Sequence, residues 1–322
     1  MTRVTVVIPA YNAAAYLGQS LDSVRAQRRP VDEIIVVDDC SSDDTCSVAI
    51  AHGALAVSTG RNSGPGRARN VGIQAASGDV IAFLDADDWW ASDHTEVVVG
   101  LLERFPEAAV AFSGARSFGA QDIEYKPPVP EEEPLDLFWT LVNSNIIPQL
   151  ATAARREALL AAGGYEESMR WAEDYDLWLR LARHHRFVCS HRMTAHYRFH
   201  DGQTTTQNPT RLMHGTCLAR YRLYELIQRE NPELSGRLAS AMREAWERAL
   251  KRAWRARNRQ ALDFGLTLSN LVPGSSAIRH RWQLRSRIAW PAWAALGRVW
   301  DAIPGPARTA LRQPLHRLTG LE

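Results

Sequence analysis

Residues 80–90 read VIAFLDADDWW, and this stretch decides the fold of the chain. Its first five residues are apolar, which predicts a buried strand. Three aspartates follow within four positions, namely Asp85, Asp87 and Asp88. An unpaired charge in a protein interior is costly. We therefore expect this strand to end at a polar edge of the sheet, where the acids have a function.

Two earlier apolar runs, at residues 4–8 and 32–37, also end in polar residues. Helical patterns separate the runs, so strands and helices alternate along the first 90 residues. This alternation predicts an α/β fold with an open sheet and right-handed crossovers. Because ligands of such sheets bind beyond the carboxyl ends of the strands, we expect three polar clusters to form one site. These clusters are Pro9-Ala10-Tyr11, Asp38-Asp39 and Asp85 to Asp88.

The same reasoning extends to the rest of the chain. Residues 126–134 (KPPVPEEEP) are too rich in proline for regular structure, and the chain after about residue 210 has mainly helical patterns. Helices are expected at residues 13–27, 43–52, 93–105, 155–162 and 173–184, and further strands at residues 55–58 and 108–113.

Asp85 and Asp87 are two residues apart, so both side chains can converge on one ion at the end of their strand. Hard divalent cations prefer carboxylate oxygens and often keep phosphate oxygens as further ligands. The pair therefore predicts a metal site that holds a diphosphate and neutralises charge on a leaving phosphate. A solvated acidic loop is the alternative explanation.

The segment GPGRARN at residues 64–70 contributes two cations, Arg67 and Arg69. Guanidinium groups suit phosphate oxygens, so either arginine is a candidate for binding phosphate or sugar hydroxyls. A tight glycine turn with a solvated Arg69 would explain the segment equally well. It is not a P-loop, because the pattern GxxxxGK[ST] is absent.

The segment WAEDYDLWLRLA at residues 171–182 is the second place where chemistry is expected. On a helix, its apolar residues would pack inward and Glu173 and Asp174 would stand in the first turn. The helix dipole favours acids at that position, so ordinary helix caps would account for them. A catalytic carboxylate is the other interpretation, and the residues alone do not decide between the two.

Five stretches together resemble the family 2 glycosyltransferases of the GT-A fold, and they occur in the order found in that family. The resemblance covers roughly residues 3–205 and leaves residues 211–322 outside it. It implies a Rossmann-like mixed sheet flanked by helices, which binds a nucleoside-diphosphate sugar. The stretches are VVIPAYNAAAYLGQSLDSVRAQ, DEIIVVDDCSSDDT, GPGRARNVGIQAASGDVIAFLDADDWW, GGYEES and WAEDYDLWLRLA.

The resemblance implies which residues bind the donor. Pro9-Ala10-Tyr11 corresponds to the loop along the nucleotide base, and Asp39 to the aspartate that accepts a hydrogen bond from uracil or an equivalent base. Asp85 and Asp87 correspond to the Asp-x-Asp motif that holds Mn²⁺ or Mg²⁺ against the diphosphate. Arg67 is expected to bind the donor.

The resemblance also implies residues on the acceptor side. Asp174 corresponds to the general base of inverting members, which takes the proton of the acceptor hydroxyl as its oxygen attacks the anomeric carbon. Glu173 is expected to contact the acceptor or to begin the helix. Asp88 is expected to contact the sugar or the acceptor, or to stabilise its own loop. His200, which precedes Gly202-Gln203-Thr204, is expected to be a third metal ligand or to touch the diphosphate. A surface histidine is the alternative.

The chain divides into an acidic part and a basic part. Residues 1–210 carry 18 Lys/Arg and 28 Asp/Glu, a balance of −10. Residues 211–322 carry 20 Lys/Arg and 8 Asp/Glu, a balance of +12. We therefore expect a GT-A catalytic domain over residues 1–210 and a helical basic C-terminal region over residues 211–322.

Tryptophan and arginine alternate at helical spacing in the basic region, as in residues 243–259 (REAWERALKRAWRARNR). Such helices can lie on an anionic membrane surface, and this is the interpretation that the +12 balance favours. A helical subdomain whose tryptophans pack on the catalytic domain would show the same pattern. Nucleic acid is not expected as a partner, because the acidic part would oppose it. The pattern continues with Trp282, Trp290, Trp293 and Trp300 and with Arg279, Arg281, Arg285, Arg287 and Arg298.

The sequence thus predicts an inverting, metal-dependent glycosyltransferase that uses a nucleoside-diphosphate sugar, with UDP-sugars favoured, and a glycan or lipid-linked acceptor. Its expected role is the assembly of a surface polysaccharide or glycoconjugate. A nucleotidyltransferase or a catalytically silent sugar-nucleotide-binding module is the alternative. The four cysteines fit no zinc or disulfide pattern, and no signal peptide or membrane span is recognised. A cytoplasmic protein, peripheral on the inner face of the cell membrane, is expected.

Overall fold

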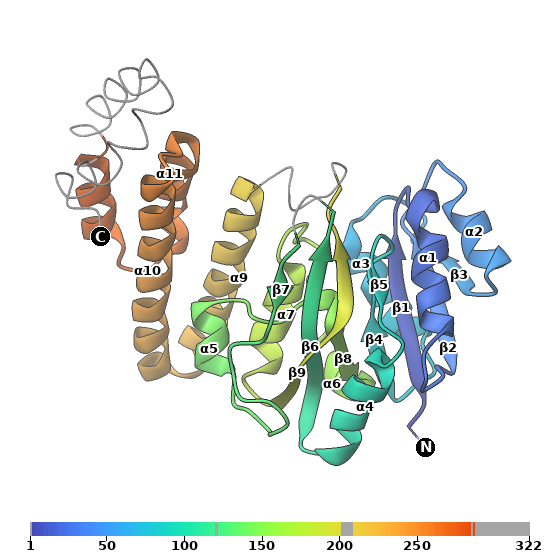
Figure 1. Cartoon of the computed structure of the whole chain (residues 1–322). Coiled ribbons are helices and arrows are strands. Elements are labelled where there is room, and N and C mark those ends of the chain that lie inside the picture. Colours follow the sequence, from blue (N-terminus) through green and yellow to red (C-terminus); the bar gives the residue numbers. More distant parts are fainter. Residues whose placement is uncertain (1, 120–121, 201–208, 285, 287–322) are drawn as a thin grey trace, which may run out of the picture.

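The computed structural model describes residues 2–119, 122–200, 209–284 and 286 (Figure 1). A mixed β-sheet of nine strands lies at its centre, in the order β3-β2-β1-β4-β8-β6-β9-β5, with β7 paired to β6 within the described part of the chain. The strands are β1 (Val4–Ala10), β2 (Glu33–Asp38), β3 (Leu55–Ser58), β4 (Val80–Phe83), β5 (Trp89–Trp90), β6 (Ala108–Phe118), β7 (Glu124–Tyr125), β8 (Thr152–Arg155) and β9 (Arg186–Arg198).

The first four strands form the predicted parallel half of the sheet. β1 lies between β2 and β4, and Val6 is in register with both Ile34 and Ala82. Val6 and Ala82 are fully buried, as expected for strands that are covered by helices on both faces. The carboxyl ends of β1, β2 and β4 therefore lie at one edge of the sheet, which confirms the predicted placement of the three polar clusters.

The second half of the sheet is antiparallel in part, which confirms the mixed sheet that the resemblance implied. Of its strands, only β6 was predicted from the sequence pattern, at residues 108–113. β8 runs antiparallel to both β4 and β6, while β9 runs parallel to β6. β5, directly after the three aspartates, pairs antiparallel with the end of β9, so that Trp89 faces His196. This pairing brings the last residues of β9 beside Asp87 and Asp88.

Helices cover both faces of the sheet. α1, α2 and α4 pack on one face, while α3, α5, α6 and α7 pack on the other. The apolar face of each helix supplies the contact, as Leu17, Leu21 and Val24 do in α1. The bounds are α1 (Ala14–Arg25), α2 (Thr45–Ala51), α3 (Pro65–Ala75), α4 (His94–Arg104), α5 (Phe138–Asn143), α6 (Arg156–Ala161) and α7 (Glu173–Leu181).

Three further helices follow α7 and lie beside the sheet on the side of α5 and α7 (Figure 1). They are α9 (Pro209–Glu230), α10 (Pro232–Arg255) and α11 (Arg259–Thr267). α9 packs on α7, and α10 packs on α9 and α5. Leu223 of α9 belongs to the same apolar cluster as Trp178 of α7, so one hydrophobic core crosses residue 210. The division of the chain at residue 210 stays a prediction.

The tryptophans of the basic region that the structure describes are interior residues. Trp246, Trp254 and Trp282 are each 2% exposed. These side chains pack in the hydrophobic core, which was the alternative to membrane contact. Within the described residues, no helix combines the length and apolar character needed to cross a bilayer. Trp290, Trp293, Trp300, Arg285, Arg287 and Arg298 lie outside the described residues.

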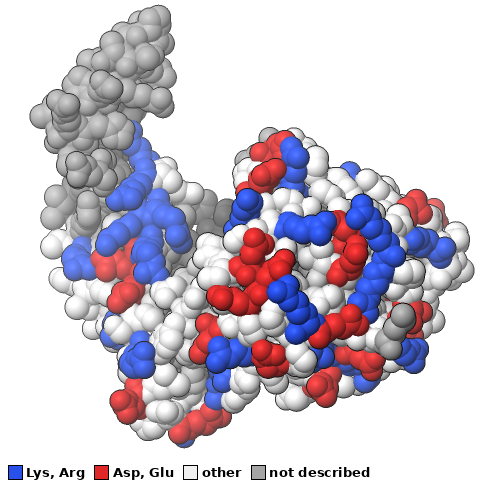
Figure 2. Space-filling model, turned by 60° about the horizontal axis from the view of Figure 1, so that its bottom comes forward, with Lys and Arg blue, Asp and Glu red and all other residues white. Residues whose placement is uncertain are grey.

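Figure 2 brings forward the end of the molecule at which the N-terminus lies. Acidic and basic side chains are mixed over the sheet and its helices on that face, without a continuous patch of one sign. A strip of Lys and Arg lies on the C-terminal helices, next to the undescribed residues. The polar clusters that follow β1, β2 and β4 lie at the other end of the strands.

Candidate active site

The loops after β1 and β2 are tied to each other by hydrogen bonds. The Asp39 backbone N–H donates to the Ala10 carbonyl at 2.8 Å. The Asn12 side-chain oxygen accepts from the Ser42 N–H at 2.8 Å, with Asn12 itself in the left-handed region at φ 48°. Tyr11 is 53% exposed on this platform, whereas Ala10 is buried. An exposed aromatic ring on a fixed loop is suited to stacking against a nucleotide base.

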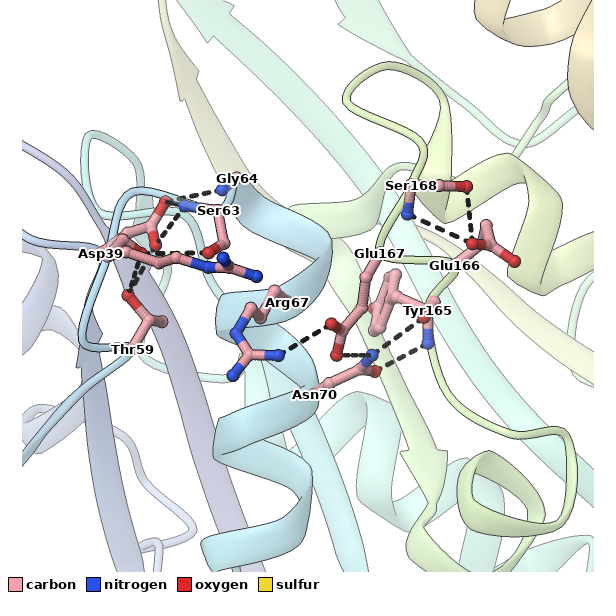
Figure 3. Close-up of polar contacts among 11 residues, drawn as sticks. Asp39, Thr59, Ser63, Gly64, Arg67, Asn70, Tyr165, Glu166, Glu167 and Ser168 are labelled. Atoms are coloured by element: carbon pink, nitrogen blue, oxygen red, sulfur yellow. Dashed lines mark hydrogen bonds and ion pairs between the residues drawn. The ribbon is translucent and has the colours of Figure 1, made fainter.

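The carboxylate of Asp39 is buried and holds the loop before α3 (Figure 3). It accepts hydrogen bonds from the Gly64 N–H at 2.7 Å, the Ser63 N–H at 2.9 Å and the Thr59 hydroxyl at 2.7 Å. These bonds use most of the acceptor capacity of the group. Asp39 therefore stabilises the loop before α3, which the sequence did not indicate. Its contact with the nucleotide base stays a prediction.

Arg67 points toward the loop that precedes α7 (Figure 3). Its Nη1 lies 2.9 Å from Glu167 Oε2, and both side chains are partly exposed. Asn70, one helical turn further on, donates to the Tyr165 carbonyl at 2.8 Å and accepts from the Tyr165 N–H at 2.7 Å. In this arrangement Arg67 joins α3 to the 165–168 loop, and its expected contact with the donor stays a prediction.

Arg69, two residues later, links the two chemical centres of the sequence. Its Nη2 lies 2.7 Å from Asp85 Oδ1 and its Nη1 lies 2.8 Å from Glu173 Oε1. The Arg69 side chain is only 5% exposed. Burial works to lower the pKa of Arg69, but the charges of Asp85 and Glu173 outweigh it and raise that pKa. The alternative in which Arg69 is merely solvated is therefore wrong.

Asp87 lies beside His200, whose Nε2 is 3.0 Å from Asp87 Oδ2. The His200 ring also packs on the Tyr16 ring, with centroids 4.8 Å apart. Burial and the nearby charge of Asp85 raise the pKa of Asp87. The chain after β9 thus brings His200 beside Asp87, and its role as a metal ligand stays a prediction. Gly202-Gln203-Thr204 lies outside the described residues.

Asp88 occupies a different environment from the two acids before it. It is 1% exposed, and its Oδ1 accepts the Arg198 backbone N–H at 2.8 Å. Burial and the charges of Asp87 and Asp85 raise its pKa well above the ordinary value. A carboxyl buried to this extent cannot contact an acceptor, so the acceptor assignment of Asp88 is wrong for this structure. Its assignment to the loop structure agrees with the contact to Arg198.

Arg198 was not predicted, and it fixes this part of the site from the end of β9. Its Nε donates to the Asp87 carbonyl at 2.9 Å, and its Nη2 donates to Gln19 Oε1. Its guanidinium carbon lies 5.0 Å from the Tyr16 ring centroid and 4.8 Å from that of Trp89. The stacked guanidinium therefore joins α1, β5 and the segment from Asp85 to Asp88.

Asp174 stands in the first turn of α7, beside the ion pair of Arg69. The residue before the helix, Ala172, has φ 57°, an uncommon conformation for a residue with a side chain. Burial, and then the charge of Glu173, raise the pKa of Asp174 to about 6. Asn145 Nδ2 donates to Asp174 Oδ2 at 3.3 Å. Asn145 was missed, because no sequence pattern singles it out.

The side chain of Glu173 is 10% exposed and faces Arg69. It is therefore committed to the ion pair, and its expected contact with the acceptor stays a prediction. Asp174 differs in that no cation lies within ion-pair distance of it in the described part of the chain. With its pKa raised to about 6, the Asp174 carboxylate can accept a proton near neutral pH.

The residues at the end of β4 fit a divalent cation. Asp85, Asp87 and His200 supply two carboxylates and an imidazole, which are ligand types that Mn²⁺ accepts, and a cation would offset the repulsion between the two aspartates. Among the described residues, no three His, Cys, Asp or Glu side chains are arranged to hold a metal by themselves. Diphosphate oxygens would have to complete the coordination.

Three kinds of comparison connect this geometry to known proteins. The family model described as glycosyl transferase family 2 matches residues 5–160. An uncharacterised glycosyltransferase of Rickettsia typhi is 27% identical over 208 residues, which are 63% of this chain and 65% of that protein. The poly(ribitol-phosphate) β-N-acetylglucosaminyltransferase TarS of Staphylococcus aureus is 30% identical over 186 residues, 54% of this chain and 31% of TarS. The match thus spans less than two thirds of each relative's length.

Solved structures show the same fold. S. aureus TarS residues 1–349 in complex with UDP-GlcNAc superpose with a TM-score of 0.66 at 18% identity, covering 84% of this chain and 82% of that one. The mannosyltransferase PcManGT of Pyrobaculum calidifontis, in complex with GDP-Man and Mn²⁺, gives a TM-score of 0.57 at 21% identity, covering 94% and 88%. The mixed sheet and its flanking helices therefore have the GT-A fold of these two proteins.

Proposed function

We propose that this chain, which belongs to glycosyl transferase family 2 through residues 5–160, moves a sugar from a nucleoside-diphosphate sugar to an acceptor hydroxyl. The proposed transfer inverts the configuration at the anomeric carbon. One observation carries the proposal, namely that Arg69 joins Asp85 of the Asp-x-Asp segment to Glu173, the neighbour of Asp174. Donor-binding acids and a candidate base thereby share one site.

A nucleotide sugar is the donor that this site suits. Exposed Tyr11 offers a stacking surface for a base, next to the loops that Asp39 fixes. The acids at the end of β4 would bind the diphosphate through a metal ion. Two proteins of the same fold were solved with UDP-GlcNAc and with GDP-Man, which supports a nucleotide sugar here without fixing the base or the sugar.

Asp85, Asp87 and His200 would hold the Mn²⁺ or Mg²⁺ ion. When bound, such an ion supplies Lewis-acid stabilisation of the charge on the leaving diphosphate. Arg69 fixes Asp85 through a charge-assisted hydrogen bond, and Arg198 fixes the Asp87 backbone. The chain's own cations thus hold the acids in place before the donor arrives, which limits reorganisation during the reaction.

Asp174 is the proposed general base. Asp174 would accept the proton of the acceptor hydroxyl while the hydroxyl oxygen attacks the anomeric carbon. The bond between the anomeric carbon and the diphosphate breaks in the same step. A pKa of about 6 leaves the carboxylate ionised at neutral pH and more basic than an ordinary aspartate. Asn145 orients one of its oxygens through the 3.3 Å hydrogen bond.

The proposed setting is the assembly of a surface polysaccharide or glycoconjugate, at the inner face of the cell membrane. TarS is named for a poly(ribitol-phosphate) acceptor, and TuaG of Bacillus subtilis, 38% identical over 115 residues, is named as a putative glycosyltransferase of teichuronic acid biosynthesis. These names support a cell-surface polymer or its precursor as the acceptor of this chain.

A panel of nucleotide sugars tests the proposal. Each would be added with Mn²⁺, and the unfolding temperature of the full chain would be recorded, because a ligand that binds only the folded state stabilises it by mass action. At least one nucleotide sugar should raise the unfolding temperature, and EDTA should reduce the shift. If every compound in the panel left the unfolding temperature unchanged, the donor class would be wrong.

A further inference from the structure

A cavity lies next to the proposed base, and none of the proposed donor-binding residues lines it. Its volume is about 750 Å³, within the range of small-molecule sites. α9, α10 and the start of α11 form its walls, together with the loop of residues 143–145. The C-terminal helices, which lie outside the matched family region, therefore build most of it.

One residue, Asn145, both lines the cavity and contacts the proposed base, Asp174. Its side-chain amide donates to Asp174 Oδ2 at 3.3 Å. Arg220, also in the cavity wall, lies over the ring of Tyr175, the residue after Asp174, at 5.2 Å from the centroid. A molecule in this cavity would thus lie beside the carboxylate that is proposed to deprotonate the acceptor.

The charged groups of the wall are of one sign. Arg220, Arg248 and Arg252 line the cavity, and no aspartate or glutamate is among its lining residues in the described part of the chain. Apolar groups such as Leu212 and Trp246 supply the remaining surface. Such a wall is complementary to a ligand that combines an anionic group with less polar parts.

The three arginines have different commitments. Arg220 donates to the Val142 carbonyl at 2.7 Å and to the Asn143 carbonyl at 3.1 Å, and Arg248 donates to Asn143 Oδ1 at 2.9 Å. They therefore hold the loop that carries Asn145. Arg252 is exposed and forms no hydrogen bond or ion pair through its side chain with any other described residue, which leaves its guanidinium available to a ligand.

We infer that this cavity binds the acceptor, and that the acceptor carries a phosphate-type anionic group, which Arg252 recognises while the acceptor hydroxyl faces Asp174. The inference rests on the proposed function, because it assigns the second substrate of that reaction. Guanidinium groups bind phosphate oxygens in charge-assisted, often bidentate pairs, so they discriminate a phosphorylated compound from its neutral parent. The phosphate can belong to a water-soluble compound or to a lipid headgroup.

The test uses the full chain with UDP and Mn²⁺ at saturation, so that the probe cannot enter the donor site. Glycerol 3-phosphate is titrated and followed by NMR, with glycerol as the neutral control. Wild type should bind glycerol 3-phosphate and not glycerol, and Arg252→Glu should weaken that binding at least tenfold. Arg229→Glu makes the same charge change at an exposed position of α9 outside the cavity, and it should bind as wild type does.

A second arm identifies the source of the phosphate, using vesicles of phosphatidylglycerol against vesicles of phosphatidylcholine. If Arg252→Glu no longer binds glycerol 3-phosphate but sediments with the anionic vesicles as wild type does, the acceptor phosphate belongs to a water-soluble compound. If the variant binds neither glycerol 3-phosphate nor the anionic vesicles, the phosphate belongs to a lipid headgroup. Equal behaviour of wild type, Arg252→Glu and Arg229→Glu in both arms would overturn the inference.

The donor measurement separates this inference from the proposed function. UDP binding in the presence of Mn²⁺ should be the same in wild type and Arg252→Glu. A wild-type protein that binds no nucleotide or nucleotide sugar would remove the proposed function itself. Intact nucleotide binding together with an Arg252→Glu variant that binds glycerol 3-phosphate normally would remove the acceptor assignment alone.

Discussion

The guanidinium group of Arg69 lies 2.8 Å from the carboxylate of Glu173, across 104 residues of sequence. Its other terminal nitrogen lies 2.7 Å from Asp85. One nearly buried cation thus connects the segment that follows β4 with the first turn of α7. This contact brings Asp85 of the Asp-x-Asp segment together with Glu173, the neighbour of Asp174, as the proposed site requires.

Replacement of Arg69 by Gln should damage stability and transfer together. The change leaves Asp85 and Glu173 partly or largely buried without their cation, and breaking a buried ion pair costs about 3–5 kcal/mol. Urea unfolding would measure the loss. Arg67→Gln is the matched control on the same helix, since its partly exposed pair with Glu167 should contribute about 1 kcal/mol or less. Equal losses in the two variants would contradict the bridging role of Arg69.

The rate of transfer should depend on the ionisation of Asp174. Its pKa is raised to about 6, so the carboxylate needed as a base is present above that pH and is lost as pH falls through it. We expect kcat/KM to fall about tenfold per pH unit below about pH 6 and to be level above pH 7. A profile that stays flat from pH 5 to pH 8 would show that Asp174 is not the titrating base.

The same pKa predicts an unusual effect of Asp174→Asn on stability. A carboxyl whose pKa in the folded state is raised above its ordinary value of 3.8 destabilises the folded state when it is ionised. This cost is absent below pH 3.8 and complete above about pH 6. Asp174→Asn should therefore raise the free energy of unfolding at pH 8, by up to about 3 kcal/mol, and leave it unchanged near pH 3.5. Urea titrations at the two pH values would show the effect, and destabilisation at pH 8 would oppose it.

Replacement of a proposed metal-binding acid should weaken nucleotide binding only when the metal is present. Asp87→Ala is expected to lower the affinity for UDP in Mn²⁺ on the order of tenfold or more, and to have little effect in EDTA. Asp122→Ala, an exposed carboxylate paired with Arg116 at 2.8 Å and outside the site, is the control for the loss of one acid. Calorimetry gives both affinities. Unchanged binding by Asp87→Ala in Mn²⁺ would remove Asp87 from the metal site.

Local patterns predicted the parallel half of the sheet and the edge at which the site lies. Each of β1, β2 and β4 is an apolar run that ends in a polar cluster, so both the strand and its functional end are visible in the sequence. β5, β8 and β9 were not predicted, because their antiparallel and crossover pairings depend on residues far apart in the chain. The position of Arg198 and His200 follows from those pairings alone.

The site residues divide in a similar way. Asp85 and Asp87 lie where their motif predicted, whereas Asp88, in the same motif, is buried under the end of β9. A sequence of adjacent acids does not show which of them the tertiary structure covers. Asn145 illustrates the opposite case, since its contact with Asp174 arises only when the loop after α5 packs beside α7.

The most direct measurement of the central claim compares wild type with Asp174→Asn, using the nucleotide sugar that stabilises the protein best. Binding of that donor in Mn²⁺ and transfer of its sugar to an acceptor would be followed in parallel, and the anomeric configuration of the product would be determined by NMR. The account predicts an inverted product from wild type, and a variant that binds the donor normally but transfers at less than about a thousandth of the wild-type rate. Near-normal transfer by Asp174→Asn, or a product of retained configuration, would contradict it.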